Sequence, residues 1–314
     1  METVLSIIKI LFFPGLLFLL VAAMLAEYID RKACAHMQNR IGPPWYQPLA
    51  DVLKLLGKKT IIPKNAGKAL FRALPSVSFA AVATAFLSIP VWGSHAVVEF
   101  EGDIVVILYL LTIPTVCLFL AGWDSHDVYT SMGSFRTLTQ MFAYEVPLFM
   151  VLLTPALIAG TWSVSGILLY YSENPLYTLI NIPAFIIALI ISQGKLERPP
   201  FDAPEAETEI VGGALVEYSG RYLAIFRMAA DSELIVVVSL LAALFLPFII
   251  GIAWIDFILY IVKILALILI LAVVKVSMAR IRMDQMLHFC WWVLTPIAAV
   301  EIIVILIVNG GIAL

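Results

Sequence analysis

The chain has 314 residues, of which 62% are hydrophobic and 13% are charged, with a formal net charge of −3 and a mean hydropathy of +1.03. Water-soluble domains of this length carry more charge, so the composition excludes that class and predicts a polytopic membrane protein. We expect an all-α fold in one membrane domain over residues 1–314.

The long apolar runs predict about eight transmembrane helices, because about 20 apolar residues are needed to cross a bilayer. No basic segment precedes the first run and no small-residue cleavage site follows it, so we expect it to remain a membrane span. The expected spans are 4–26, 73–92, 104–121, 137–159, 178–193, 220–250, 254–279 and 289–309.

The basic residues predict an orientation. Seventeen of the 19 Lys and Arg residues lie in or beside alternate connections, and the other two lie inside spans. The remaining connections, 93–103, 160–177 and 251–256, contain none. Basic connections stay in the cytoplasm. We therefore expect a multi-pass protein of the cell (plasma) membrane with both termini outside.

The first basic connection contains an expected amphipathic helix over 48–59. Its leucines share a face with Val52, opposite Lys54, and Gly57 ends it. The segment 41–48 before it is rich in Pro and aromatic residues and disfavours helix. The helix is either an anchor lying on lipid or a strap that holds a hydrophilic partner or shapes a cavity. The rigid turn favours the strap.

The expected span 137–159 contains one carboxylate, Glu145, with Pro147 two residues later. Ionisable groups inside membranes are costly and are usually kept for ion or proton movement. We therefore predict that Glu145 belongs to an ion or proton relay. The alternative is a protonated glutamate that hydrogen-bonds a neighbouring helix and serves packing alone.

An acidic loop at 197–218 concentrates six carboxylates. Asp202 and Glu205 match an N-terminal capping box, which is a purely structural explanation for them. The spacing also places Glu205 and Glu209 one turn apart, with Glu217 further along the same expected helix, where like charges repel. Because crowding and burial raise carboxyl pKa values, we favour a relay. Its expected members are Glu145, Asp202, Glu205, Glu207, Glu209, Glu217 and Asp231.

The other candidate groups are sparse. Lys263 and Glu301 lie in the last two expected spans, where they can pair with each other. The three cysteines and four histidines are scattered without metal-ligand spacing, and no phosphate-binding or dinucleotide motif appears. We expect no cofactor or metal site in this chain and no nucleic-acid partner.

Eight ordered stretches carry a family resemblance: residues 30–32, 38–43, 47–55, 121–123, 144–146, 198–209, 216–218 and 280–285. The longest reads Arg-Pro-Pro-Phe-Asp-Ala-Pro-Glu-Ala-Glu-Thr-Glu. With them the chain resembles, over nearly its whole length, the H-subunit family of complex I, the ion-pumping NADH:quinone oxidoreductase. The resemblance implies an eight-span protein that joins the peripheral electron-transfer arm to the antiporter-like pumping arm, with its glutamates on or near the coupling route. Expected partner-docking residues in these stretches are Arg31, Lys32, Arg40, Arg198, Arg280, Arg282 and Asp284.

Two positions depart from the quinone-reducing members, which carry glutamates where this chain has Lys195 and Ala230. The chain looks more like the corresponding subunit of two archaeal ferredoxin-linked relatives, the membrane-bound nickel–iron hydrogenase and the sulfane sulfur reductase. These complexes need no quinone.

The predicted function is that of a coupling subunit without a catalytic centre, inside an ion-translocating oxidoreductase complex. Iron–sulfur clusters, and in a hydrogenase a nickel–iron centre, would lie in hydrogenase-like peripheral subunits docked on the cytoplasmic face. Antiporter-like membrane subunits would move protons or sodium. The alternatives are a quinone-binding subunit of complex I and a stand-alone secondary transporter. The absence of an internal repeat argues against the transporter.

Overall fold

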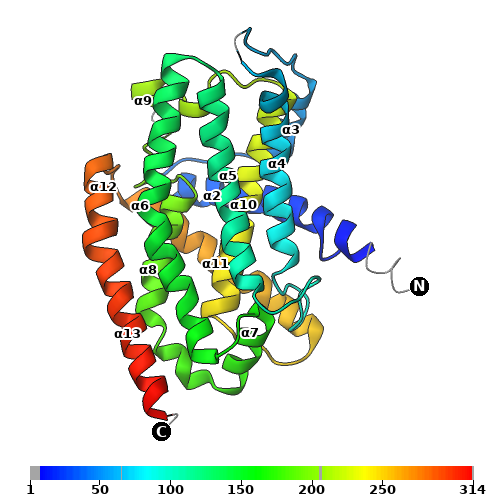
Figure 1. Cartoon of the computed structure of the whole chain (residues 1–314). Helices are drawn as coiled ribbons and strands as arrows, with labels where there is room; N and C mark the ends of the chain where they lie inside the picture. The colour runs from blue at the N-terminus through cyan, green and yellow to red at the C-terminus, as the bar shows by residue number, and fades with distance from the viewer. Residues whose placement is uncertain (1–7, 65, 205–206, 313–314) are drawn as a thin grey trace.

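The computed structural model describes residues 8–64, 66–204 and 207–312, with side chains for all of these except 207–208 and 308–312. The described secondary structure is entirely helical (Figure 1), which confirms the predicted all-α class. Most of the long helices run side by side in a single bundle.

Seven helical segments are long and apolar enough to cross a membrane, by the length and composition of the described residues. They confirm a polytopic membrane protein. They are Ile8–Met37, which contains α2 (Leu16–Met37), α4 (Lys68–Leu87), α5 (Asp103–Asp124), α6 (Val128–Ala159), α10 (Arg221–Phe245), α11 (Ala253–Ser277) and Met283–Ile307. The last comprises α12 (Met283–Phe289), the π-helical turn η3 (Cys290–Leu294) and most of α13 (Thr295–Ile312).

The expected span 178–193 is occupied by a shorter helix, α8 (Ile182–Lys195), which has 14 residues. Its length is about 21 Å at 1.5 Å per residue, less than the roughly 30 Å of hydrocarbon in a bilayer. The preceding residues form α7 (Val164–Glu173) and the 3-10 helix η1 (Pro175–Leu179). A proline in the first turn of α8 fixes its start, because proline is favoured there and breaks a helix further in.

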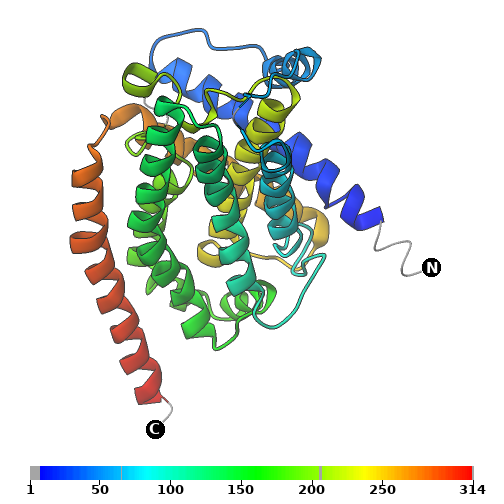
Figure 2. The ribbon, with the colours of Figure 1, turned by 45° about the horizontal axis from the view of Figure 1, so that its top comes forward.

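The first helix differs from its expected bounds. Residues around Pro14 interrupt it, and α2 then continues to Met37 instead of ending near residue 26. Figure 2 shows α2 crossing the bundle obliquely. The consequence is that Glu27 and Asp30, which hydropathy places in a connection, lie on a helix at the bundle.

The amphipathic helix is confirmed as α3 (Gln47–Gly57), and it packs against α2 and α10. Pro48 and Val52 are buried, whereas Leu53 and Leu56 are exposed. The helix therefore uses one side to close over the ends of α2 and α10 (Figure 1).

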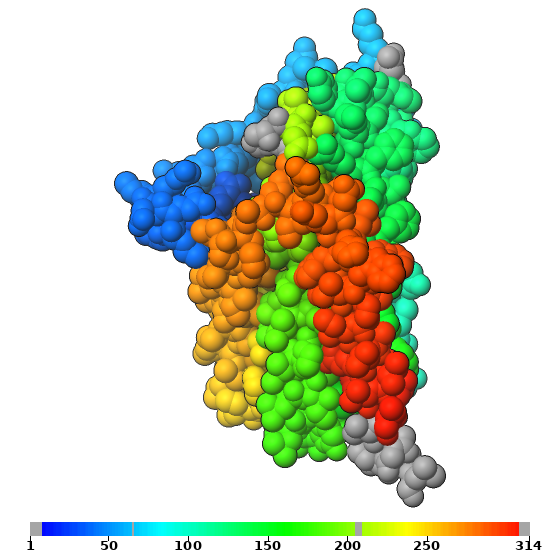
Figure 3. All heavy atoms as spheres, turned by 90° about the vertical axis from the view of Figure 1, so that its left-hand side faces the viewer, coloured from blue at the N-terminus to red at the C-terminus, as the bar shows by residue number. Residues whose placement is uncertain are grey.

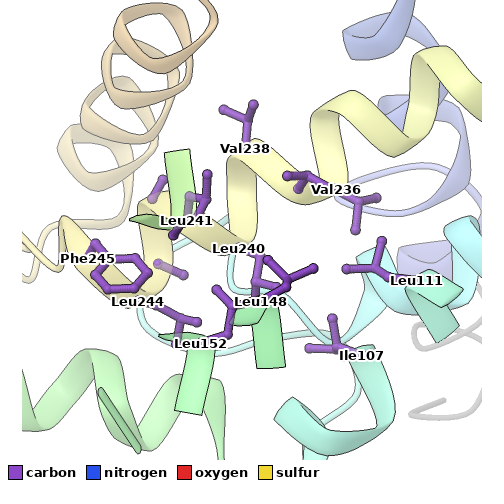
Figure 4. Packing of buried hydrophobic residues seen from close by; sticks show 14 of the residues in the cluster. Ile107, Leu111, Leu148, Leu152, Val236, Val238, Leu240, Leu241, Leu244 and Phe245 are labelled. Atoms are coloured by element: carbon purple, nitrogen blue, oxygen red, sulfur yellow. The ribbon is translucent and has the colours of Figure 1, made fainter. Parts of the chain in front are cut away.

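Helix α10 is the centre of the bundle, with 83% of its most apolar stretch buried. Figure 4 shows Leu240 of α10 facing Leu148 and Leu152 of α6, with Leu111 of α5 nearby. On another face, α8 lies between α11 and α13 (Figure 3). The core is thus an apolar layer around α10.

The basic connections lie at one end of the bundle. The backbone amide of Ile61 donates to Ser219 Oγ at 3.1 Å, which joins the connection after α3 to the start of α10. An ion pair of 2.6 Å joins Arg136 to Glu209 at the same end. Figure 1 shows α3 and α9 together at the upper end and α7 at the opposite end.

The acidic loop is not one helix, so the expected helical face shared by Glu209 and Glu217 is wrong. Its helix α9 covers only Glu207–Ile210, and the 3-10 turn η2 (Gly213–Leu215) follows. Val211 has a positive φ of 65° and Gly213 one of 64°. Left-handed backbone of this kind ends a helix, so Glu217 lies on a separate turn.

Candidate functional site

A cavity of about 280 Å³ lies between α2, α4, α5, α10 and the segment that follows α8. We call it the charged chamber, because five carboxylates and three cations line it. They are Glu27, Glu197, Asp202, Asp231 and Glu233, with Lys195, Arg198 and Lys275. Burying so many charges is costly unless they pair with one another or with water.

A buried ion pair lies on the inner side of the chamber. The ammonium of Lys195, the last residue of α8, lies 2.6 Å from Glu233 Oε1 on α10, and the Lys195 side chain is only 2% exposed. Lys195 Nζ also donates to Thr115 Oγ1 on α5 at 2.8 Å. The Thr115 hydroxyl in turn lies 3.2 Å from the Tyr144 hydroxyl on α6. One cation thus connects four helices.

A second network forms the wall that faces α2 and α11. Asp30 is fully buried, and its carboxylate accepts a hydrogen bond from Lys275 Nζ at 2.9 Å and lies 3.1 Å from Arg198 Nη1. Arg31 pairs with Glu27 and, at 3.0 Å, with Asp51 of α3. These contacts hold α2, α3, α11 and the acidic loop together around the chamber.

A third set of charges lies at the surface end. Asp202 Oδ1 lies 3.3 Å from Arg280 Nε, and Glu209 is held between Arg136 at 2.6 Å and Arg280 at 3.4 Å. The hydrogen bond from Arg136 and the charges of both arginines hold the pKa of Glu209 below its usual range. The expectation that crowding raises its pKa is wrong for Glu209, because its immediate neighbours are cations.

Glu145 lies on α6 and is not among the residues that line the charged chamber. It is half-buried on α6, and its carboxylate forms no ion pair or hydrogen bond with any residue that the structure describes. The charge that acts on it is that of Lys195. The place of Glu145 in the relay therefore stays a prediction.

The other predicted relay residues do not share one location in the part of the chain that the structure describes. Asp231 and Asp202 line the chamber, and Glu217 is half-buried on the turn before α10. Glu205 lies outside the described residues, and only the backbone of Glu207 is described. The structure thus brings Asp202 and Asp231 to one cavity but places Glu209 outside it.

The predicted docking residues also divide. Arg40, Arg282 and Asp284 are exposed at the end that carries the basic connections. The guanidinium groups of Arg31, Arg198 and Arg280 pair with carboxylates of the chain itself, and Lys32 donates to Ile41 O at 2.7 Å. These four hold the chain's own connections in place.

The expected pair between Lys263 and Glu301 is wrong. Lys263 Nζ donates to the carbonyl of Phe248 at 2.8 Å, whereas Glu301 Oε1 accepts from the amide of Ala184 at 3.1 Å. Each group therefore binds a backbone atom, Lys263 in the connection between α10 and α11 and Glu301 in the first turn of α8.

Sequence reasoning missed the residues that close the chamber, namely Glu27, Asp30 and the pairing of Lys195 with Glu233. For Lys195, the sequence does contain a signal. Lys195 and Glu233 are a cation and a carboxylate at apolar helices, and opposite charges that are buried together must pair. For Glu27 and Asp30 the missing information was the true length of α2.

The bundle and its chamber define a class: a polytopic helical membrane protein that encloses a charged cavity near one end. A family model described as NADH dehydrogenase matches residues 8–306, and the chain belongs to this family. The curated H subunit of the NADH-quinone oxidoreductase of Frankia casuarinae is 33% identical, covering 92% of this chain and 69% of the relative. That of Syntrophotalea carbinolica is 31% identical, covering 96% of this chain and 97% of the relative.

A solved structure is also similar. A chain of the membrane-bound sulfane sulfur reductase, an archaeal respiratory membrane complex, superimposes with a TM-score of 0.84 at 27% identity, covering 92% of this chain and 96% of that chain. The predicted resemblance to the H subunit of complex I and to the archaeal sulfane sulfur reductase is confirmed. The chain is a membrane subunit of a complex I-like respiratory oxidoreductase.

Proposed function

We propose that this chain couples electron transfer in docked iron–sulfur subunits to the movement of protons or sodium through neighbouring antiporter-like subunits. It contributes no catalytic centre of its own. The observation that carries the proposal is the charged chamber, which begins at the arginine-rich surface and ends at the buried ion pair of Lys195 and Glu233.

The chamber supplies a physical route for coupling. Charges in a water-poor cavity interact more strongly than charges in bulk water, because the effective dielectric constant is lower. A change of charge in a partner docked near Arg282 acts first on the surface set of Asp202 and Arg280, then on Asp231, and finally on Lys195 and Glu233. Glu145 receives the change last.

We propose that the electron donor is ferredoxin and that the complex is a hydrogenase or a sulfane sulfur reductase. Its clusters, including a nickel–iron centre in the hydrogenase case, lie in partner subunits. The similarity to the sulfane sulfur reductase chain supports this assignment. So does Lys195, because its charged side chain occupies the inner end of the cavity with Glu233.

The second candidate is a quinone-binding subunit, favoured by the curated relatives, whose names are those of the H subunit of NADH-quinone oxidoreductase. A site for an apolar ligand is usually lined mainly by hydrophobic and aromatic side chains. The eight charged residues around this chamber do not suit such a ligand.

The proposed orientation places the end with α3, the acidic loop and α12 in the cytoplasm, at the plasma membrane, with both termini outside. The clustering of cations at that end supports it, through Arg136, Arg280 and Arg282. The exposed Arg40, Arg282 and Asp284 are then the residues that remain available for docked partners.

The test is purification of the intact complex, identification of its subunits by mass spectrometry and reconstitution into sealed vesicles. We expect ion uptake driven by reduced ferredoxin and no effect of a quinone-site inhibitor added at stoichiometric levels. Inhibition of turnover at that level would support the quinone-binding function, and ion uptake by this chain alone would support a stand-alone transporter.

A further inference from the structure

Helix α6 is longer than the membrane is thick. Its 32 residues extend about 48 Å at 1.5 Å per residue, whereas the hydrocarbon of a bilayer is roughly 30 Å thick. Figure 1 shows the start of α6 at the upper end of the bundle, further out than the start of α12. Part of α6 therefore lies outside the hydrocarbon, and the neighbouring charges identify which part.

The ion pairs of Arg136 show where α6 leaves the membrane. Arg136 lies 2.6 Å from Glu209 of α9, and both side chains are partly exposed. Arg280 lies 3.4 Å from the same carboxylate. Charged groups exposed to hydrocarbon are costly, so these pairs lie in the headgroup region or in water. The first two turns of α6, residues 128–135, extend about 12 Å beyond Arg136 on the side away from the membrane. They therefore lie in water.

These two turns have an exposed apolar surface. Val128, Met132 and Phe135 follow one another at helical spacing, and each is more than half exposed. Trp123 at the end of α5 is also more than half exposed. The ring of Phe119 lies 5.8 Å from that of Trp123 and 6.1 Å from that of Phe135, so it joins the two helices. We call Trp123, Val128, Met132 and Phe135 the end patch.

The charges near the end patch do not suit a lipid surface. Helices that lie on lipid are rich in Lys and Arg beside their apolar face, but the chain contains no Lys or Arg over residues 73–135. The edge of the patch is acidic instead, with Asp124 at the end of α5 and Asp127 at the start of α6. Both carboxylates accept from backbone amides, those of Gly67 and Tyr129.

We propose that the end patch is the docking site of a water-soluble subunit of the complex, which covers it with apolar side chains and brings Lys or Arg side chains to its acidic edge. Exposed apolar patches with a polar rim mark protein interfaces, and Trp, Phe and Met are enriched at the centre of such interfaces. The inference rests on the proposed function, which requires docked iron–sulfur subunits, and it names the surface that one of them covers.

The first test identifies the occupant in the intact complex. Phe135 is replaced by the photo-reactive amino acid benzoylphenylalanine, which keeps an aromatic side chain on the surface. The purified complex is irradiated, and the cross-linked peptides are identified by mass spectrometry. We expect cross-links to a subunit that has no membrane span. Cross-links from position 135 only to lipid or only to a membrane-spanning subunit would overturn the inference.

Phe142 is the matched control. It lies two turns further along the same face of α6, on the membrane side of Arg136, and has the same exposed fraction as Phe135, 56%. With benzoylphenylalanine at position 142 we expect cross-links to lipid or to a membrane-spanning subunit. Cross-links from both positions to the same water-soluble subunit would contradict the boundary drawn at Arg136.

The second test measures how fast the water-soluble subunits leave the immobilised complex during washing with buffer. Truncation of a central interface residue acts mainly on the rate of dissociation, and we expect Phe135→Ala to accelerate release on the order of ten-fold. Phe142→Ala should release them at the rate of the unaltered complex. The melting temperature of the remaining membrane part should be equal in the two variants, which separates lost docking from lost folding. Equal release rates in both variants would overturn the inference.

Failure of the proposed function gives a different result. A complex without iron–sulfur clusters or without ion uptake, in which position 135 still cross-links to a water-soluble subunit, would refute the coupling role and leave the docking site. A coupled complex with clusters, in which position 135 cross-links to lipid, would refute the docking site alone.

Discussion

Two carboxylates inside the helical bundle, Glu145 and Glu301, have different surroundings and therefore different expected roles. Glu301 Oε1 accepts from the backbone amide of Ala184 at the start of α8, where a helix leaves amide groups without partners. Glu145 has no such contact among the described residues and is influenced by Lys195. Sequence alone makes both residues lone carboxylates in apolar helices, so only the neighbours separate them.

We predict that Glu301→Gln assembles normally and keeps ion uptake, because the amide oxygen still accepts from Ala184. Glu301→Leu removes the acceptor and leaves a buried amide unpaired, at a cost of about 1–3 kcal/mol. The thermal stability of the purified complex measures the difference. Loss of ion uptake in a stable Glu301→Gln complex would make Glu301 part of the relay.

A pH dependence is expected at Glu209. Because the pKa of Glu209 is lowered by its hydrogen bond with Arg136, its contribution to docking of the acidic loop is complete above the usual glutamate pKa of about 4.3. It is lost as the pH falls through the lower pKa of the folded protein. Amide hydrogen exchange of residues 207–212 should therefore increase at acid pH.

The control for Glu209 is Glu209→Gln, which cannot titrate. We expect its exchange rates, after correction for the intrinsic effect of pH, to be raised already at neutral pH and to vary little as the pH falls. Equal protection of the loop in both proteins at every pH would show that the two arginines do not hold it through Glu209.

Among the elements, the acidic loop shows how a local pattern can mislead. The capping box and the spacing of the glutamates favour a single helix, but Gly212 and Gly213 end it and η2 turns back against α5 and α6. A Cβ on Gly122 or Gly133 would lie within 3.0 Å of backbone atoms of Ala214. Close contact between backbones therefore determines the shape of the loop. The helical periodicity of the sequence does not predict such a contact.

Gly133→Ala should displace η2, because the added Cβ would lie 2.6 Å from Ala214 N and 2.7 Å from Gly213 Cα. Overpacking of this kind typically costs about 1–3 kcal/mol. We expect a lower melting temperature of the complex and weaker binding of the peripheral subunits. Gly57→Ala, at the end of α3, is the matched control because nothing lies within 4 Å of its Cβ position. Equal stability of the two variants would contradict the close packing of η2.

For the whole molecule, hydropathy was sufficient for the helical class and for most of the spans. Hydropathy placed α5 and α11 almost at their bounds, because both are long and strongly apolar runs. It failed for α2, whose last three turns carry the paired charges of Glu27, Asp30 and Arg31, and for the shortened α8. A helical segment whose charges pair inside the fold has the low hydropathy of a connection, so hydropathy alone assigns it to a connection.

The orientation can be tested with single cysteines at opposite ends, in a background without reactive native thiols. We predict that Gly57→Cys on α3 reacts with an impermeant maleimide only from the cytoplasm, and Leu176→Cys in η1 only from outside. Both positions are exposed. Labelling of residue 57 from outside would reverse the orientation and remove the basis for the proposed docking end.

The most direct test of the coupling role is the number of ions moved per electron in sealed vesicles that contain the intact complex with Glu145→Gln. Glutamine keeps the shape and hydrogen bonding of the side chain but cannot carry the proton or the charge. We predict that electron transfer from ferredoxin to a soluble acceptor continues while ion uptake falls to the leak level. A ratio of ions to electrons equal to that of the unaltered complex would contradict a coupling role for Glu145.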